Sequence, residues 1–130
     1  MSKLIPKENR LPPPPTKATL SKYGLTAEDW TVMCVVQQLT CPVCQQPFGD
    51  RKLVIDHEHV KGWRARKGKL KSGRRRANKD TRVMTPAERR PHVRGILHAW
   101  CNRYVRAWLT LSRALSIVAY LKAHEERRAT

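Results

Sequence analysis

Residues 98–102 read HAWCN, a histidine and a cysteine separated by two residues, with an asparagine directly after the cysteine. Upstream, residues 41–44 read CPVC, so the chain carries C-x2-C, then 53 residues, then H-x2-C. Zinc takes thiolate and imidazole ligands in a tetrahedron, and two short turns with two ligands each supply that geometry. We therefore predict a structural zinc site. Its four ligands are Cys41, Cys44, His98 and Cys101.

The alternative for CPVC is a redox-active pair with an unrelated Cys101, although no βαβ pattern surrounds it. Cys34 is a separate case. It lies on the apolar face of a helix predicted over residues 26–39, which Thr26 caps and where two acidic residues occupy the first turn. We expect Cys34 to be a buried apolar residue rather than a ligand.

Composition limits the possible partners. The 130 residues include 27 Lys and Arg against 10 Asp and Glu, a formal net charge of +17, which favours nucleic acid as the partner. No secretory signal pattern is present, and no apolar run approaches the roughly 18 residues of a membrane span. We expect a soluble cytoplasmic protein without a membrane partner, in which reduced cysteines are available for metal binding.

The length allows one domain with a modest core. Residues 1–20 contain four consecutive prolines and basic residues, and they are predicted to be a flexible arm preceding a single domain over residues 21–130. Residues 103–128 are predicted to be one long C-terminal helix. Its apolar residues cover more than one stripe, so packing within the monomer and a dimer interface both remain open.

Residues 60–92 are predicted to be a basic insertion. From Lys61 to Arg94 there are 14 Lys and Arg and two acidic residues, and the segment is far longer than the roughly 2 to 5 residues of a usual hairpin loop. It is either a solvated loop or an arm that follows DNA phosphates. The predicted DNA contacts are Arg64, Arg66, Lys67, Lys69, Lys71, Arg74, Arg75, Arg76 and Arg94.

The segment DHEH at 56–59 follows a predicted strand, LVID, and places one acid and two histidines within four residues. Alternation along a strand puts His57 and His59 on one face and Asp56 on the other. Two histidines could bind a second zinc. In a hydrolytic site, Asp56 and the amide oxygen of Asn102 would instead hold a hard divalent cation, and His57 would be the base.

Five segments in the same order resemble the recombination endonuclease VII family of phage nucleases, part of the His-Me finger (HNH) superfamily. They are YGLTAEDW at 23–30, CPVC at 41–44, LVIDHEH at 53–59, VRGILHAWCN at 93–102 and AYL at 119–121. The resemblance implies an α+β fold with a zinc-stapled ββα-metal core, flanked by an N-terminal helix and a long C-terminal helix.

The resemblance also implies roles for the site residues. Asp56 and Asn102 would bind a catalytic magnesium or manganese ion, His57 would be the general base, and His59 would assist at the phosphate or the metal. Three features differ from the family pattern: His98 replaces a usual Cys, the basic insertion replaces a short connection, and RYVR after Asn102 lacks a usual Leu-Gly pair and an acidic residue. The second strand is therefore expected to begin near Val93.

The leading hypothesis is a magnesium-dependent endonuclease that acts as a homodimer on branched DNA such as Holliday junctions, in phage recombination or packaging within the bacterial cytoplasm. One alternative is an HNH nicking or homing-type endonuclease on duplex DNA. The other is a zinc-stabilised DNA-binding regulator without catalysis. An acid such as Asp56 repels DNA unless a cation intervenes, which favours an enzyme over a regulator.

Overall fold

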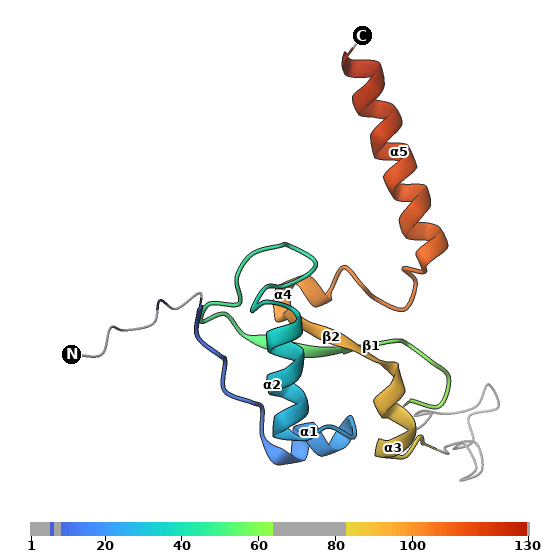
Figure 1. The fold of residues 1–130 in the computed structure, drawn as a ribbon. Coiled ribbons are helices and arrows are strands. Elements are labelled where there is room, and N and C mark those ends of the chain that lie inside the picture. Colours follow the sequence, from blue (N-terminus) through green and yellow to red (C-terminus); the bar gives the residue numbers. More distant parts are fainter. Residues whose placement is uncertain (1–5, 7–8, 64–82, 130) are drawn as a thin grey trace, which may run out of the picture.

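The computed structural model describes residues 6, 9–63 and 83–129. Two strands, β1 (Leu53–His57) and β2 (Val93–His98), pair as an antiparallel sheet at the centre of the domain (Figure 1). The helices are α1 (Lys17–Lys22), α2 (Ala27–Val36), α3 (Pro86–Arg89), the 3-10 turn η3 (Arg90–His92), α4 (Ala99–Asn102) and α5 (Leu111–Ala129). The predicted small α+β fold is confirmed.

The register of the sheet shifts near the predicted catalytic segment. Leu53 pairs with His98 and Asp56 with Gly95, but His57 pairs with Val93, so Arg94 is an extra residue on β2. Such a bulge bends its strand and redirects side chains, and bulges are frequent beside active sites. The second strand begins at Val93, as predicted.

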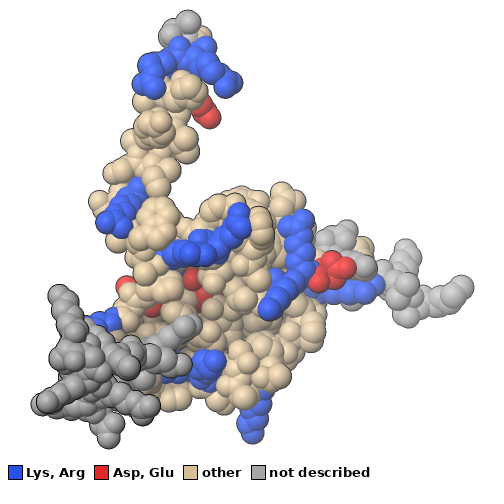
Figure 2. All heavy atoms as spheres, turned by 180° about the vertical axis from the view of Figure 1, so that it is seen from behind, with Lys and Arg blue, Asp and Glu red and all other residues tan. Residues whose placement is uncertain are grey.

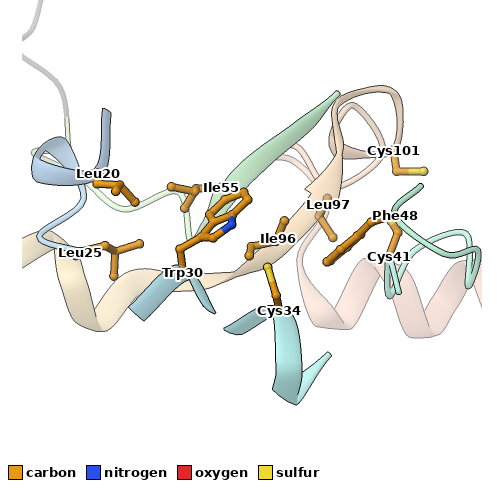
Figure 3. Close-up of a cluster of buried hydrophobic side chains, with 10 residues drawn as sticks. All are labelled: Leu20, Leu25, Trp30, Cys34, Cys41, Phe48, Ile55, Ile96, Leu97 and Cys101. Carbon is orange, nitrogen blue, oxygen red and sulfur yellow. The ribbon is translucent and has the colours of Figure 1, made fainter. Parts of the chain in front are cut away.

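The core lies between α2 and the sheet. Trp30 and Cys34 on α2 face Ile55, Ile96 and Leu97 on the strands (Figure 3). The remaining members of the cluster are Leu20, Leu25, Cys41, Phe48 and Cys101. Cys34 is fully buried, and burial raises the pKa of its thiol to about 11. Its predicted role as a buried apolar residue is confirmed.

One side chain binds the outer edge of β2. The amide of Gln37, the residue that ends α2, accepts a hydrogen bond from the Ile96 N–H and donates one to the Ile96 carbonyl, both at 2.8 Å. A Cβ at Gly95 would lie 2.9 Å from Gln37 Oε1, so this close approach depends on a glycine. Gln37 therefore pairs with the edge of β2 as a neighbouring strand would.

Replacing Gln37 with Ala is expected to lower the free energy of unfolding by about 2 kcal/mol, because two backbone groups of a largely buried strand lose their partner. Urea denaturation followed by circular dichroism measures the change. Gln46, whose side chain is exposed, offers a matched control, and Gln46→Ala should change stability by less than about 0.5 kcal/mol. Equal stability of the two variants would contradict the role of Gln37.

The N-terminal segment differs in part from the predicted arm. Thr16 caps α1, Leu20 is 4% exposed within the core, and the Trp30 indole donates a hydrogen bond to the Pro12 carbonyl at 3.1 Å. The boundary predicted at residue 20 falls inside α1. The second half of this stretch therefore packs against the domain.

The predicted insertion over residues 60–92 also contains packed structure. Residues 64–82 lie outside the described part of the chain, but the Met84 N–H donates to the Gly62 carbonyl at 2.8 Å, so the two flanks meet. Arg90 forms a two-pronged ion pair with Asp29 at 2.6 and 2.8 Å, which holds the pKa of that carboxyl well below its usual range. Residues 83–92 thus belong to the folded domain.

The predicted helix over residues 103–128 is wrong at its start. α4 ends at Asn102, and α5 begins only at Leu111. Arg94 donates to the Val105 carbonyl at 3.2 Å, and Arg113 donates to the Trp108 carbonyl at 2.6 Å. In a continuous helix these carbonyls would instead accept hydrogen bonds from backbone N–H groups. α5 extends away from the sheet, and none of its residues is buried (Figure 1).

Candidate metal centre and active site

The structure brings the four predicted zinc ligands together. The thiol sulfurs of Cys41, Cys44 and Cys101 and a ring nitrogen of His98 all lie within 4.8 Å of one another. A tetrahedron with metal–sulfur bonds of about 2.3 Å places its sulfurs roughly 3.8 Å apart, close to this spacing. Among the described residues, this is the one cluster of three or more His, Cys, Asp or Glu with such geometry.

Local structure explains why these side chains converge. The loop after α2 closes on itself, since the Cys41 N–H donates to the Gln46 carbonyl and the Gln45 N–H donates to the Cys41 carbonyl. His98 is the last residue of β2, and Cys101 follows within α4. The cluster therefore connects the loop after α2 to the end of the hairpin.

His98 has a defined orientation. Its ring is 2% exposed, and Nε2 lies 3.1 Å from the Phe48 carbonyl oxygen, which can only accept a hydrogen bond. Nε2 therefore carries the proton, and Nδ1, 3.3 Å from Cys44 Sγ, is the nitrogen that can bind a metal. A carbonyl that fixes the tautomer in this way is typical of metal-binding histidines.

The surroundings of Cys41 and Cys101 shift the pKa values of their thiols in opposite directions. Burial, together with the neighbouring Cys44 and Cys41, raises the pKa of Cys101 to about 11. Burial also acts to raise the pKa of Cys41, but hydrogen bonds from the backbone N–H groups of Cys44, His98 and Val43 outweigh it and lower that pKa. Three sulfurs and one imidazole in this space suit a thiophilic cation, and these residues could hold a zinc ion.

Asp56, the predicted metal ligand of the second site, is paired with Arg94. The carboxylate is buried, and Arg94 donates from Nε to Oδ2 at 2.8 Å and from Nη2 to Oδ1 at 3.0 Å. Arg94 was expected among the DNA contacts, but its guanidinium lies on this acid. The other eight predicted DNA contacts lie within residues 64–82, outside the described part of the chain.

His57 lies in an aromatic cluster. Its ring stacks on Trp63 with ring centroids 3.8 Å apart and 15° between the planes, and His59 and Tyr23 lie at 5.0 and 5.9 Å. Trp63 is 6% exposed, and Arg89 donates to its carbonyl at 2.9 Å. The sequence alone did not identify this contact. The signal that could have indicated the contact is Trp63 itself, an aromatic residue at the start of an otherwise basic segment.

Asn102 ends α4, directly after the cluster residue Cys101. It is half-buried, and its main-chain carbonyl accepts a hydrogen bond from the Val105 N–H at 3.2 Å. Because Arg94 binds both the Val105 carbonyl and Asp56, the turn after Asn102 is linked to the acid through one guanidinium. This network connects the two predicted sites.

Comparison with known proteins identifies the family of this chain. Residues 16–123 match the family model for recombination endonuclease VII. The chain belongs to the recombination endonuclease VII family. This match confirms the resemblance carried by CPVC, DHEH and HAWCN. The match begins at residue 16, which agrees with the packing of α1 against the domain.

A relative of this endonuclease VII family member is the Gene 59 protein of Mycobacterium phage D29. The two share 29% identity over 90 residues, which cover 68% of this chain and 37% of the relative. The chain therefore spans little more than a third of that protein. No solved structure matches significantly. Within the described residues, no helix combines the length and apolar character needed to cross a membrane.

Proposed function

We propose that the chain is a metal-dependent endonuclease that hydrolyses phosphodiester bonds in branched DNA, such as Holliday junctions, during phage recombination or packaging in the host cytoplasm. The observation that carries this proposal is that the buried Asp56 and the aromatically packed His57 are consecutive residues at a β-bulge. Family membership supports the reaction class. The net charge of +17 supports a polyanionic substrate.

Two metals are part of the proposal. A zinc ion bound by the Cys3His cluster would hold the ββα-metal core together. Asp56 and the Asn102 amide oxygen would hold magnesium or manganese, hard cations that prefer oxygen ligands. An ionised carboxylate has about four lone pairs, and Arg94 uses two of those on Asp56, so two remain that could bind a cation. That ion would stabilise charge on the scissile phosphate.

His57 is suited to be the general base. Its Nδ1 lies 3.3 Å from the Glu58 carbonyl oxygen, so in this hydrogen bond Nδ1 is the donor. In the neutral ring, Nε2 is then the basic nitrogen and can take the proton from the attacking water. His59, whose ring lies 5.0 Å away, would contact the phosphate or the metal.

The deciding experiment compares a four-way DNA junction with a linear duplex built from the same arm sequences. Each substrate is incubated with the protein in magnesium, in manganese and in EDTA, alongside His57→Ala. Metal-dependent junction cleavage that His57→Ala abolishes supports the proposal. Equal cutting of the duplex indicates a nicking or homing-type enzyme. Binding without cleavage in either metal would instead indicate a zinc-stabilised regulator, and the proposal would fail.

A homodimer is also part of the proposal, because two symmetric nicks resolve a junction. Six large apolar residues on α5 are each at least 42% exposed and offer a surface that a second copy can cover. They are Leu111, Leu115, Ile117, Val118, Tyr120 and Leu121. Sedimentation velocity of the full chain tests this, and a monomer at micromolar concentration would contradict it.

Trp63 is expected to position His57 for the reaction. Trp63→Leu keeps an apolar side chain but removes the stacking surface, and we expect turnover to fall about tenfold with little change in KM. Trp63→Phe, which restores an aromatic ring, should recover most of the loss. NMR of the His57 ring protons provides a readout apart from activity, because the stacked indole shifts their resonances. Unchanged resonances in Trp63→Leu would rule out this role.

Removing residues 64–82 is expected to weaken DNA binding and to flatten its salt dependence, because eight of the predicted phosphate contacts lie there. The Met84 to Gly62 hydrogen bond brings the flanks together, so a short Gly-Ser linker can replace the segment without disturbing α3. Fluorescence anisotropy with labelled duplex at several salt concentrations measures both quantities. An unchanged salt slope would show that the segment does not contact phosphates.

A further inference from the structure

An exposed aromatic and basic patch lies on α4 and the turn that follows it, beside the Cys3His cluster. Trp100 is 65% exposed, and the guanidinium carbon of Arg103 lies 3.4 Å from the centroid of its ring. Tyr104, which is 51% exposed, lies 5.2 Å from the same carbon. Exposed aromatic rings held by arginine are suited to stacking on another flat ring.

A surface hollow of about 380 Å³ opens next to this indole. Among the described residues, its lining consists of Arg51, Lys52, His98, Ala99, Trp100 and Cys101. The two basic side chains are exposed, and no acidic residue is part of this lining. The Ala99 N–H donates to the Lys52 carbonyl at 2.9 Å, so the start of α4 lies beside the residues that enter β1 and Trp100 is close to the two basic residues.

The chemistry of this hollow fits one nucleotide. An indole offers a face to a base, and two cations offer charge to a phosphate, while the volume lies within the usual range for small-ligand sites. Arg103 is not part of the lining described above and lies over the indole. It can hold the ring while a base approaches from the hollow. On the face shown in Figure 2, Lys and Arg side chains cover more of the surface than Asp and Glu side chains do, which suits a polyanionic ligand.

We propose that Trp100, Arg51 and Lys52 form a subsite for a single unstacked nucleotide of the DNA substrate, with the base on the indole and its phosphate on the two cations. This inference rests on the proposed function, since it takes branched DNA as the substrate. A base inside an intact duplex cannot reach the indole, whereas an unpaired base can. The subsite therefore favours DNA in which a nucleotide can leave the helix stack, as at a branch point or a bulge, and α4 also contains Asn102.

The test measures binding in EDTA, where cleavage is suppressed, by fluorescence anisotropy of the full chain with two labelled duplexes. One is fully paired and the other carries a single unpaired nucleotide. Trp100→Ala is expected to weaken binding of the second duplex about tenfold and of the first less than twofold. Trp100→Phe should restore most of the affinity. Trp108→Ala removes another exposed indole, from the turn before α5, and should leave both affinities unchanged.

A third duplex, with an abasic site at the unpaired position, isolates the stacking contact. Trp100→Ala should have no effect on this DNA, because the base that the indole contacts is already absent. An equal loss on all three duplexes, or no loss on any, would overturn the subsite. Failure to cleave junctions would contradict the proposed function but leave this pattern unaffected, so the two proposals fail independently. Zinc content and circular dichroism confirm that the variants are folded.

Discussion

Replacing Cys41 with Ser is expected to leave the chain largely unfolded, with less than a tenth of an equivalent of bound zinc. Cys41 contributes both a sulfur to the cluster and a fully buried side chain to the core. Structural zinc in small domains contributes roughly 10–16 kcal/mol of apparent binding energy, and most of it is folding energy. A small core cannot replace that contribution.

The measurements are zinc content by mass spectrometry and thermal unfolding followed by circular dichroism. Cys34→Ala is the matched control, because Cys34 is also a fully buried cysteine but lies outside the cluster. This control should lose roughly 1–2 kcal/mol of stability and keep one zinc ion. If Cys41→Ser unfolds at the wild-type temperature, or if both variants lose zinc equally, the assignment of the cluster is wrong.

The cluster could be predicted because its information is local. CPVC and HAWCN each place two ligands on one short turn, and the fold only has to bring two turns together. The start of α2 is similar. Thr26 and Asp29 form a reciprocal capping box within four residues, and the helix begins where these residues predict. Spacing along the chain was sufficient in both cases.

The surroundings of the catalytic segment could not be predicted in the same way. Arg94 reaches Asp56 because a bulge adds one residue to β2, and sequence alternation does not reveal a bulge. Trp63 stacks on His57, and Arg89, 26 positions later, binds the Trp63 carbonyl. Long-range contacts of this kind depend on the packed domain rather than on local pattern.

The start of α5 shows the same limit. The apolar periodicity from residue 103 onward is compatible with a continuous helix. In the structure, Arg94 and Arg113 take two of the carbonyls that such a helix would use, and Thr110 caps the helix that follows by accepting from the Arg113 N–H at 3.2 Å. Propensity favoured a helix there, but side-chain hydrogen bonds from a distant strand and from the next turn compete with it.

Replacing Asp56 with Asn is expected to reduce the single-turnover rate of junction cleavage about a thousandfold while the protein remains folded. The substitution removes the charge of the proposed magnesium ligand, and metal-bound charge stabilisation contributes several kcal/mol to such reactions. The fold should tolerate the change, because Asn is nearly isosteric and the Arg94 side chain is 40% exposed, so water can solvate its charge. Isothermal titration with manganese should show weaker metal binding.

Glu58→Gln is the matched control, since Glu58 lies two positions from Asp56 but its side chain is 59% exposed and pairs with His92 at 2.8 Å. This variant should cleave within about threefold of the wild-type rate.

DNA affinity separates binding from catalysis. Both substitutions remove one negative charge, so neither variant should bind DNA more weakly than the wild type in EDTA. Loss of cleavage by Asp56→Asn with undiminished DNA binding therefore isolates the chemical step. Wild-type cleavage by Asp56→Asn would place the catalytic metal elsewhere, and weaker binding by both variants would show that these carboxylates support the DNA-binding surface instead.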